Sequence, residues 1–448
     1  MEVAGVPPKQ GSTLLRNVRW LVSYQSARWV IGFLMGAWVA RVLGPGDFGV
    51  LATAAAASAL AWCGMELGMK QIIIVELSRR RRIAALVAGT AAKLWMASGV
   101  VFSLLAAVWN ASGENSPRVP WWVFWATMTP LLLMFFQIHN YWEEASQRSF
   151  VAARNRMAGY LAAAVVRLGC LIGLPTVTAF AWTNASEHVV SGGLGAVFGA
   201  RRGRSVWLRG WHWKIAKSFL LRGGAVIVGQ FGMLTLLRVD TIMLEDMQGM
   251  TEAGIYGAAV RLSEMAYLIA PMIITLMLPA IAAAVKTGDG RLVALEGRAS
   301  DLITAVGAAS VVGLLAGGPL AIRWLFGQEF LRSEAVLLVH CLSVVPLFMM
   351  EWRTAMLIAM DRLGMSAALS WGAALLNLLL NACWIPQYGA LGAAWATVAS
   401  YAAGGVLGTW LLPGCRWMAW SQVRSLVAPL RWLASPRKEW SRVSADIR

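Results

Sequence analysis

Apolar residues in this 448-residue chain gather into long blocks, with few polar positions inside them. Each block is about 20 residues long, the length that an α-helix needs to cross the hydrocarbon core of a bilayer. Short stretches with glycine, proline or charged residues separate the blocks. The pattern predicts an all-α polytopic membrane protein without a separate soluble domain.

The apolar blocks can be divided into twelve predicted transmembrane helices. They cover residues 20–43, 47–69, 84–109, 120–142, 157–175, 177–199, 218–244, 254–284, 300–325, 335–360, 364–384 and 389–412. The sixth block is the weakest, because it contains Glu187 and His188. An even number of spans places both termini on the same side of the membrane.

The basic residues indicate which side of the membrane carries the two termini. The chain has 39 Lys and Arg and a net charge of +17. In the twelve-span arrangement 29 of them fall on the side of the termini and 4 on the opposite side. Cytoplasmic loops collect Lys and Arg, so both termini are predicted to be cytoplasmic. The same rule accounts for the net charge, and we expect no nucleic-acid partner.

Cysteine spacing and sequence motifs give no sign of a metal centre or of catalysis. The five cysteines form no CxxC or other paired spacing, and most lie inside apolar blocks. No nucleotide-binding glycine loop, HExxH or G-x-S-x-G motif occurs, and the predicted outer loops are short. We therefore expect free thiols, no metal, no cofactor and no enzyme activity.

The two halves of the chain carry similar segments. "DFGVLATA" (47–54) aligns with "EAGIYGAA" (252–259), and each follows an odd-numbered span. The halves are therefore predicted to run parallel in the membrane, six helices each, around a central cavity. This gives an N-terminal lobe (1–200), a basic cytoplasmic linker (201–217), a C-terminal lobe (218–412) and a basic cytoplasmic tail (413–448).

Leaving aside Glu187 and His188 of the weak sixth block, we consider ten ionisable residues within the predicted spans. A charge that faces lipid near the midplane costs about 2.5–3.5 kcal/mol, so these residues should face the helix bundle or water. The candidate cations for substrate binding in the cavity are Arg28, Lys93, Arg167, Arg238 and Arg353. The candidate charge network within the lobes consists of Glu66, Asp240, Arg261, Glu264 and Glu351.

The depth of these residues along their helices suggests pairings. Asp240 and Arg261 lie at similar heights, so we expect a structural ion pair between them, with Glu264 completing it. Arg238 is about 200° around the helix from Asp240, which points it toward the cavity or the outer headgroups.

The sequence also suggests roles for Arg28, for two asparagines and for the excess of cations within the spans. Arg28 either pairs with Glu66 or offers its cation to the cavity; both readings stay open. Asn377 and Asn381 share one helix face and are expected to form helix-to-helix hydrogen bonds. Among the ten ionisable residues considered, cations outnumber anions six to four, which favours an anionic substrate such as a phosphate group.

Several segments resemble one known family. They are "ARVLGPGDFGVLA" (40–52), "MELGMKQIIIVELSR" (65–79), "VDTIML" (239–244), "AGIYGAAVRLSEMAYLIAPMIITLMLPAIA" (253–282), "LFGQEF" (325–330) and "NLLLNACWIPQYGALGAAWATVASY" (377–401). Together they resemble the polysaccharide biosynthesis flippases. These are Wzx-type O-antigen and exopolysaccharide translocases of the multidrug/oligosaccharidyl-lipid/polysaccharide exporter superfamily. The resemblance extends over nearly the whole chain.

The resemblance implies two six-helix lobes that alternate in access around a cavity. It implies movement of an undecaprenyl-pyrophosphate-linked oligosaccharide, the repeat unit of O-antigen, capsule or exopolysaccharide, from the cytoplasmic to the periplasmic leaflet of a bacterial inner membrane. In such proteins helices one, two, seven and eight line much of the cavity. By position this carries over to Arg28, Glu66, Arg238, Asp240, Arg261 and Glu264.

The chain departs from the pattern in two places, and alternatives remain. Span ten carries Glu351 and Arg353, and the first span lacks the acidic residue that couples cations in many drug exporters. The alternatives are a cation-coupled drug or metabolite antiporter of the same superfamily and a membrane enzyme of glycan assembly. Expected partners are the lipid-linked glycan and membrane lipids, with polysaccharide polymerase or ligase machinery as a further candidate. A coupling ion, H⁺ or Na⁺, is left open.

Overall fold

The computed structural model describes residues 10–113, 117–201, 210–287 and 290–435. Over these ranges the chain is almost entirely helical and contains no β-strand. Residues 202–209 of the predicted linker and 436–448 of the predicted tail lie outside the described residues. The all-α fold class expected from the apolar blocks is confirmed.

The chain divides into two compact units. The first takes Met1–Val42 with Ala57–Ile227, and the second takes Leu43–Ala56 with Val228–Arg448. Helices of the first unit are α2 (Lys70–Arg79), α3 (Ala84–Ala111), α4 (Trp121–Leu133), α5 (Ile138–Ala145), α6 (Ser149–Gly173) and α7 (Val177–Ala200). Two long helices, α1 (Gln10–Glu66) and α8 (Trp213–Gln248), contribute to both units.

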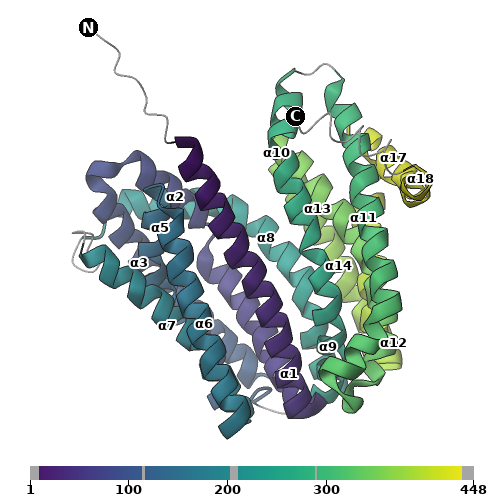
Figure 1. Cartoon of the computed structure of the whole chain (residues 1–448), viewed down its shortest axis with the longest axis horizontal. Coiled ribbons are helices and arrows are strands. Elements are labelled where there is room, and N and C mark those ends of the chain that lie inside the picture. Colours follow the sequence, from purple (N-terminus) through teal and green to yellow (C-terminus); the bar gives the residue numbers. More distant parts are fainter. Residues whose placement is uncertain (1–9, 114–116, 202–209, 288–289, 436–448) are drawn as a thin grey trace. The chain divides into compact units, whose positions relative to one another are not determined.

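The second unit contains the remaining helices. They are α9 (Met250–Tyr267), α10 (Ile269–Thr287), α11 (Arg291–Ala321), α12 (Arg332–His340), α13 (Val344–Ala359), α14 (Leu363–Tyr388), α15 (Ala390–Ala402), α16 (Gly408–Leu411), α17 (Arg416–Ser425) and α18 (Ala428–Ala434). Helices α10, α11 and α13 pack against one another, and α17 and α18 pack on α11 (Figure 1).

Ten segments of the described chain are long and apolar enough to span a membrane, judged by length and composition. One of them, Arg28–Arg79, contains the first two predicted spans, so eleven of the twelve blocks are represented. The exception is the sixth block, which forms α7 but is not among the ten. Its polar residues, Glu187 and His188 included, make it the weakest block in the sequence as well.

The two similar segments share an unusual local structure. The break between the first two spans is a kink in α1 at Gly44 (φ 74°, ψ 172°). The aligned residue before α9, Gly249, has almost the same conformation (φ 89°, ψ 174°). Positive φ is readily adopted only by glycine, so both copies require it. The sequence repeat is therefore also a repeat of backbone geometry.

The segments also approach each other closely within the second unit. A Cβ atom on Gly49 would lie 1.8 Å from the carbonyl oxygen of Met250. A Cβ atom on Gly254 would lie 1.9 Å from the carbonyl oxygen of Pro45. The contact is reciprocal, so the repeated glycines allow the two backbones to touch, as small residues do between membrane helices.

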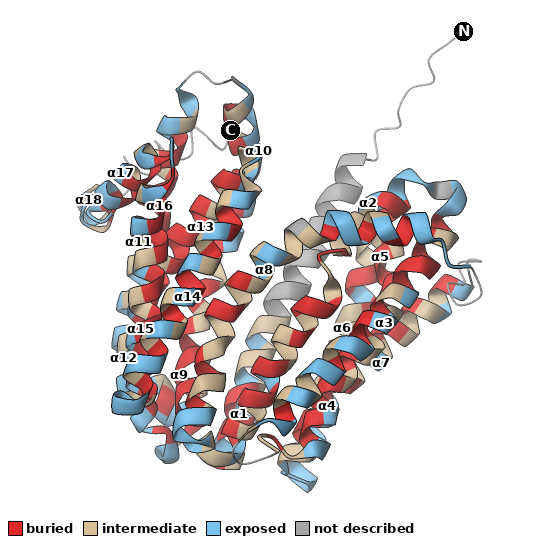
Figure 2. Ribbon diagram, turned by 180° about the vertical axis from the view of Figure 1, so that it is seen from behind, coloured by how far each residue is buried: buried red, intermediate tan, exposed pale blue. Residues whose placement is uncertain are grey.

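Buried residues lie on the facing sides of the helices in each unit (Figure 2). In the first unit Trp95 and Phe124 are fully buried, and in the second Phe348 and Trp352 of α13 are. Between membrane helices such packing stabilises mainly by van der Waals contact, since lipid tails are as apolar as these side chains.

Candidate functional site

Arg28 of α1 forms an ion pair inside the first unit. Its Nη2 lies 3.2 Å from Oε1 of Glu187 in α7, and its guanidinium lies 5.8 Å from the ring centre of Tyr160 in α6. The side chain of Arg28 remains 42% exposed and that of Glu187 15%. The partner was missed in the sequence, where Glu187 served only to weaken the sixth span.

Glu66 ends α1 and does not form the ion pair considered for Arg28. Its backbone carbonyl accepts hydrogen bonds from Nε1 of Trp95 (3.2 Å) and from the amide of Met69 (3.0 Å). Leu67 and Gly68 follow with positive φ, which ends the helix there. Glu66 therefore marks the turn between α1 and α2.

Arg238 of α8 pairs with Glu264 of α9 in the second unit. Its Nη1 and Nη2 donate to the two carboxylate oxygens at 2.9 and 3.4 Å. The side chain of Arg238 is 33% exposed and that of Glu264 25%. Glu264 was expected to join Arg261; instead the Arg261 guanidinium lies over the ring of Phe48, 5.2 Å from its centre.

Asp240 is almost fully buried and is held by neutral groups. Its carboxylate accepts hydrogen bonds from Tyr256 Oη, Asn381 Nδ2 and Thr397 Oγ1, each at 2.6 Å. The predicted pair with Arg261 is thus wrong. Tyr256 and Arg261 lie about 140° apart around α9, so only one of them can face Asp240.

The groups around Asp240 come from three helices: Tyr256 from α9, Asn381 from α14 and Thr397 from α15. Asn381 Nδ2 also donates to Asn377 Oδ1 (3.0 Å), while the buried Asn381 Oδ1 has no hydrogen-bond partner. Asn377 in turn donates to Ser400 Oγ at 3.3 Å, so the expected helix-to-helix bonding of the two asparagines is confirmed.

We call Asp240, Asn377, Asn381 and Thr397 the Asp240 cluster. It combines one carboxylate with neutral amide and hydroxyl oxygens. An unpaired buried oxygen is costly unless it binds something, and oxygen ligands with a single charge suit a small monovalent cation. Among the described residues no group of three or more His, Cys, Asp or Glu is placed to hold a metal ion.

Two further candidate cations, Arg167 and Lys93, also lie in the first unit. Arg167 donates to Thr183 Oγ1 (3.1 and 3.0 Å) and Asn184 Oδ1 (2.9 Å), which links α6 to α7. Lys93 of α3 lines a small pocket of about 170 Å³ together with Phe135 and His139. Arg167 also lies close enough to Glu187 and Tyr160, the partners of Arg28, to interact with them electrostatically.

Arg353 is fully buried in α13. Its Nη1 donates to the carbonyl of Gly404, which lies in a π-helical turn (Ala403–Leu407). Such turns displace carbonyls from regular helix bonding. Nε and Nη2 of Arg353 have no hydrogen-bond partner. Arg353 therefore belongs to the packing of the second unit, and the half-buried Glu351 lies close enough to interact with it electrostatically.

The solved structures to which the chain is similar include transporters and a flippase. The chain is similar to an inward-facing multidrug resistance MATE family transporter of the MOP superfamily, with a TM-score of 0.72 and 15% identity, over 90% of this chain and 95% of that chain. It is similar to lipid II flippase MurJ in an inward closed conformation, with a TM-score of 0.69 and 12% identity, over 96% of both chains. At these identities the likeness shows a shared fold.

The family follows from the sequence comparison. No protein with a curated functional description matches the chain. A family profile described as "Polysaccharide biosynthesis protein" matches residues 14–285, more than half of the chain. Together with the helical membrane fold, this match shows that the chain belongs to the polysaccharide biosynthesis protein family.

Proposed function

We propose that this multi-pass membrane protein is a flippase for a lipid-linked oligosaccharide. The substrate is an undecaprenyl-pyrophosphate-linked repeat unit, moved from the cytoplasmic to the periplasmic leaflet of a bacterial inner membrane, with both termini of the protein cytoplasmic. The observation that carries the proposal is that membrane-spanning arginines remain partly exposed, Arg28 at 42% and Arg238 at 33%, in a chain of this family.

The glutamates beside these arginines suit such a role. A lone guanidinium within the membrane is costly, and Glu187 and Glu264 compensate the charge while no substrate is bound. Phosphate oxygens accept from a guanidinium in the same forked geometry as a carboxylate. A pyrophosphate can therefore replace a glutamate, so that one charged pair is exchanged for another. A pyrophosphate that binds one conformation of the protein more tightly than the other shifts the equilibrium toward that conformation.

The Asp240 cluster supplies a place for a coupling ion. A Na⁺ ion there would take the Asp240 carboxylate and the unpaired Asn381 Oδ1 as ligands, with Asn377 Oδ1 and Thr397 Oγ1 nearby. A proton on Asp240 would neutralise the same charge. Because the cluster joins α8, α14 and α15, cation binding changes how firmly these helices hold together.

The cation-coupled antiporter of drugs or metabolites is the second candidate. A MATE transporter shares the fold, so the fold alone does not separate the two. Arg28 and Arg238 are partly exposed and paired with glutamates, which suits an anionic substrate better than a cationic drug. Polysaccharide polymerase or ligase machinery remains a candidate partner.

The test is complementation of a strain that lacks its own flippase. Arg28→Ala and Arg238→Ala should each abolish surface glycan while the lipid-linked precursor accumulates on the cytoplasmic side. The matched control is Arg323→Ala, because Arg323 forms a pair with Glu334 that is at least as close (2.6 and 3.0 Å), in the π-helical turn that follows α11 (Ile322–Phe326). Normal surface glycan in both variants, together with sensitivity to toxic cations, would favour the antiporter.

A further inference from the structure

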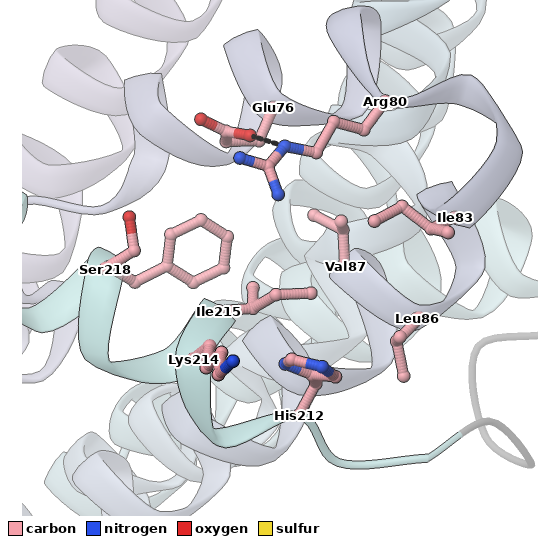
Figure 3. Close-up of a pocket in the computed structure, with 10 residues that line it drawn as sticks. Glu76, Arg80, Ile83, Leu86, Val87, His212, Lys214, Ile215 and Ser218 are labelled. Atoms are coloured by element: carbon pink, nitrogen blue, oxygen red, sulfur yellow. Dashed lines mark ion pairs between the residues drawn. The ribbon is translucent and has the colours of Figure 1, made fainter.

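A pocket of about 420 Å³ lies in the first unit, apart from the Arg28 pair. The end of α2, the turn before α3 and the start of α8 form its walls (Figure 3). Its floor is apolar, built from Val87, Ile215 and Phe219, all buried. The volume lies within the range of small-molecule sites, about 300–1,000 Å³.

The rim of this pocket is basic. Arg80 and Lys214 line it and are both exposed, and His212 lies beside Lys214 (Figure 3). One carboxylate is present: Glu76 Oε2 lies 2.8 Å from Arg80 Nε, and its Oε1 lies 2.6 Å from Arg222 Nη1. Because two arginines share this single glutamate, positive charge remains at the rim together with Lys214.

The Glu76 pairs also fix the shape of the pocket. Glu76 and Arg80 belong to α2 and Arg222 belongs to α8, so the carboxylate ties the two walls together. The amide of His212 donates to Thr90 Oγ1 of α3 at 3.3 Å, which anchors the chain before α8. The pocket is therefore formed by bonds between its walls rather than by loose surface side chains.

Large apolar side chains are exposed beside the cations. Trp211 is 45% exposed, Trp213 61% and Leu221 69%, and Ile83 on the pocket wall is 40% exposed. Tryptophans gather where hydrocarbon meets water, and basic residues flank spans on the cytoplasmic side. A ligand at this boundary meets both cations and exposed hydrocarbon.

We propose that this pocket binds the headgroup of a resident anionic phospholipid, with the acyl chains lying along the exposed apolar residues. The phosphate is placed between Arg80 and Lys214, and the glycerol portion over Val87 and Phe219. Basic pockets between membrane helices are known hosts for anionic headgroups. The inference does not depend on the transported substrate, and it would hold equally for an antiporter.

The experiment is native mass spectrometry of the full chain in detergent with added dioleoyl phosphatidylglycerol. The wild type should bind one such lipid in a saturable way, more tightly than phosphatidylcholine. The double variant Arg80→Ala/Lys214→Ala should lose affinity by about fivefold per cation, or about 25-fold together. Ser218→Trp keeps every charge but fills the pocket, and it should remove the tight site as well.

The matched control is Arg79→Ala/Lys217→Ala, which removes two exposed cations of α2 and α8 that do not line the pocket. It should change affinity by less than about twofold. An equal loss in the control pair would show diffuse surface charge and overturn the proposal. Displacement of the lipid by equimolar inorganic phosphate would identify a free-phosphate site instead. Equal binding of phosphatidylcholine to the wild type, a comparison that needs no variant, would also overturn it.

Discussion

The Asp240 cluster gives the sharpest prediction about the second unit, that Asp240→Asn abolishes stabilisation by Na⁺. The asparagine retains the shape of the side chain but removes the only negative charge of the cluster. Its amide can face Asn381, which can turn so that its unpaired Oδ1 accepts a hydrogen bond. The cost to folding should therefore be small, about 1 kcal/mol.

The comparison variant is Asp240→Ala, which removes the whole carboxylate group. Asp240→Ala loses three charge-assisted bonds of 2.6 Å, each worth about 1.5–3 kcal/mol. Part of this is recovered, because Thr397 Oγ1 also reaches Ala393 O (3.0 Å) and Asn381 Nδ2 reaches Asn377 Oδ1 (3.0 Å). We expect a net loss of about 2–4 kcal/mol for Asp240→Ala.

The assay is thermal unfolding of the detergent-solubilised protein in NaCl and in choline chloride at equal ionic strength. Na⁺ at about one hundred times its Kd should stabilise the wild type by about 2.7 kcal/mol, and Asp240→Asn by nothing. If the ion is H⁺, the wild type should respond to pH and not to Na⁺, and Asp240→Asn to neither. A Na⁺ response that persists in Asp240→Asn would refute the assignment.

Three further predictions concern packing and access. Gly254→Ala should destabilise the protein by about 3 kcal/mol or more in the same unfolding assay, because its Cβ would lie 1.9 Å from Pro45 O. The control is Gly313→Ala, which should be neutral or stabilising because nothing lies within 4 Å of its Cβ. Arg353→Met should change stability by at most about 1 kcal/mol and leave complementation intact, because Arg353 is buried with two unpaired nitrogens. Loss of glycan export at normal expression would contradict a packing role for Arg353. Cys383 should react with a membrane-permeant maleimide while buried Cys63, Cys341 and Cys415 stay protected, as mass spectrometry of single-cysteine variants can show.

The helices and their breaks could be predicted because they depend on local features. Uninterrupted apolar blocks determine where helices can lie, and Gly44 and Pro45 separate the first block from the second. The repeat was visible because the close approach of Gly49 and Gly254 tolerates no side chain, which keeps the same residue type in both copies.

The partners of the charged residues were harder to predict. Depth along a helix suggested that Asp240 and Arg261 share one height, but it does not show which face of α9 is turned toward α8. Tyr256 occupies that face. Likewise, no local pattern indicates that α7 lies beside α1, so the Arg28–Glu187 pair could not be found from spacing. Long-range packing decides these contacts, and a single sequence does not encode it in periodicity.

Translocation itself is tested most directly with purified protein in liposomes that carry a fluorescent undecaprenyl-pyrophosphate-linked oligosaccharide. Access of an impermeant quencher to the labelled headgroup reports movement between leaflets. The wild type and Arg323→Ala should accelerate this movement, and Arg28→Ala and Arg238→Ala should leave it near the protein-free rate. Wild-type protein that does not exceed the protein-free rate, with or without a Na⁺ or pH gradient, would contradict the flippase assignment.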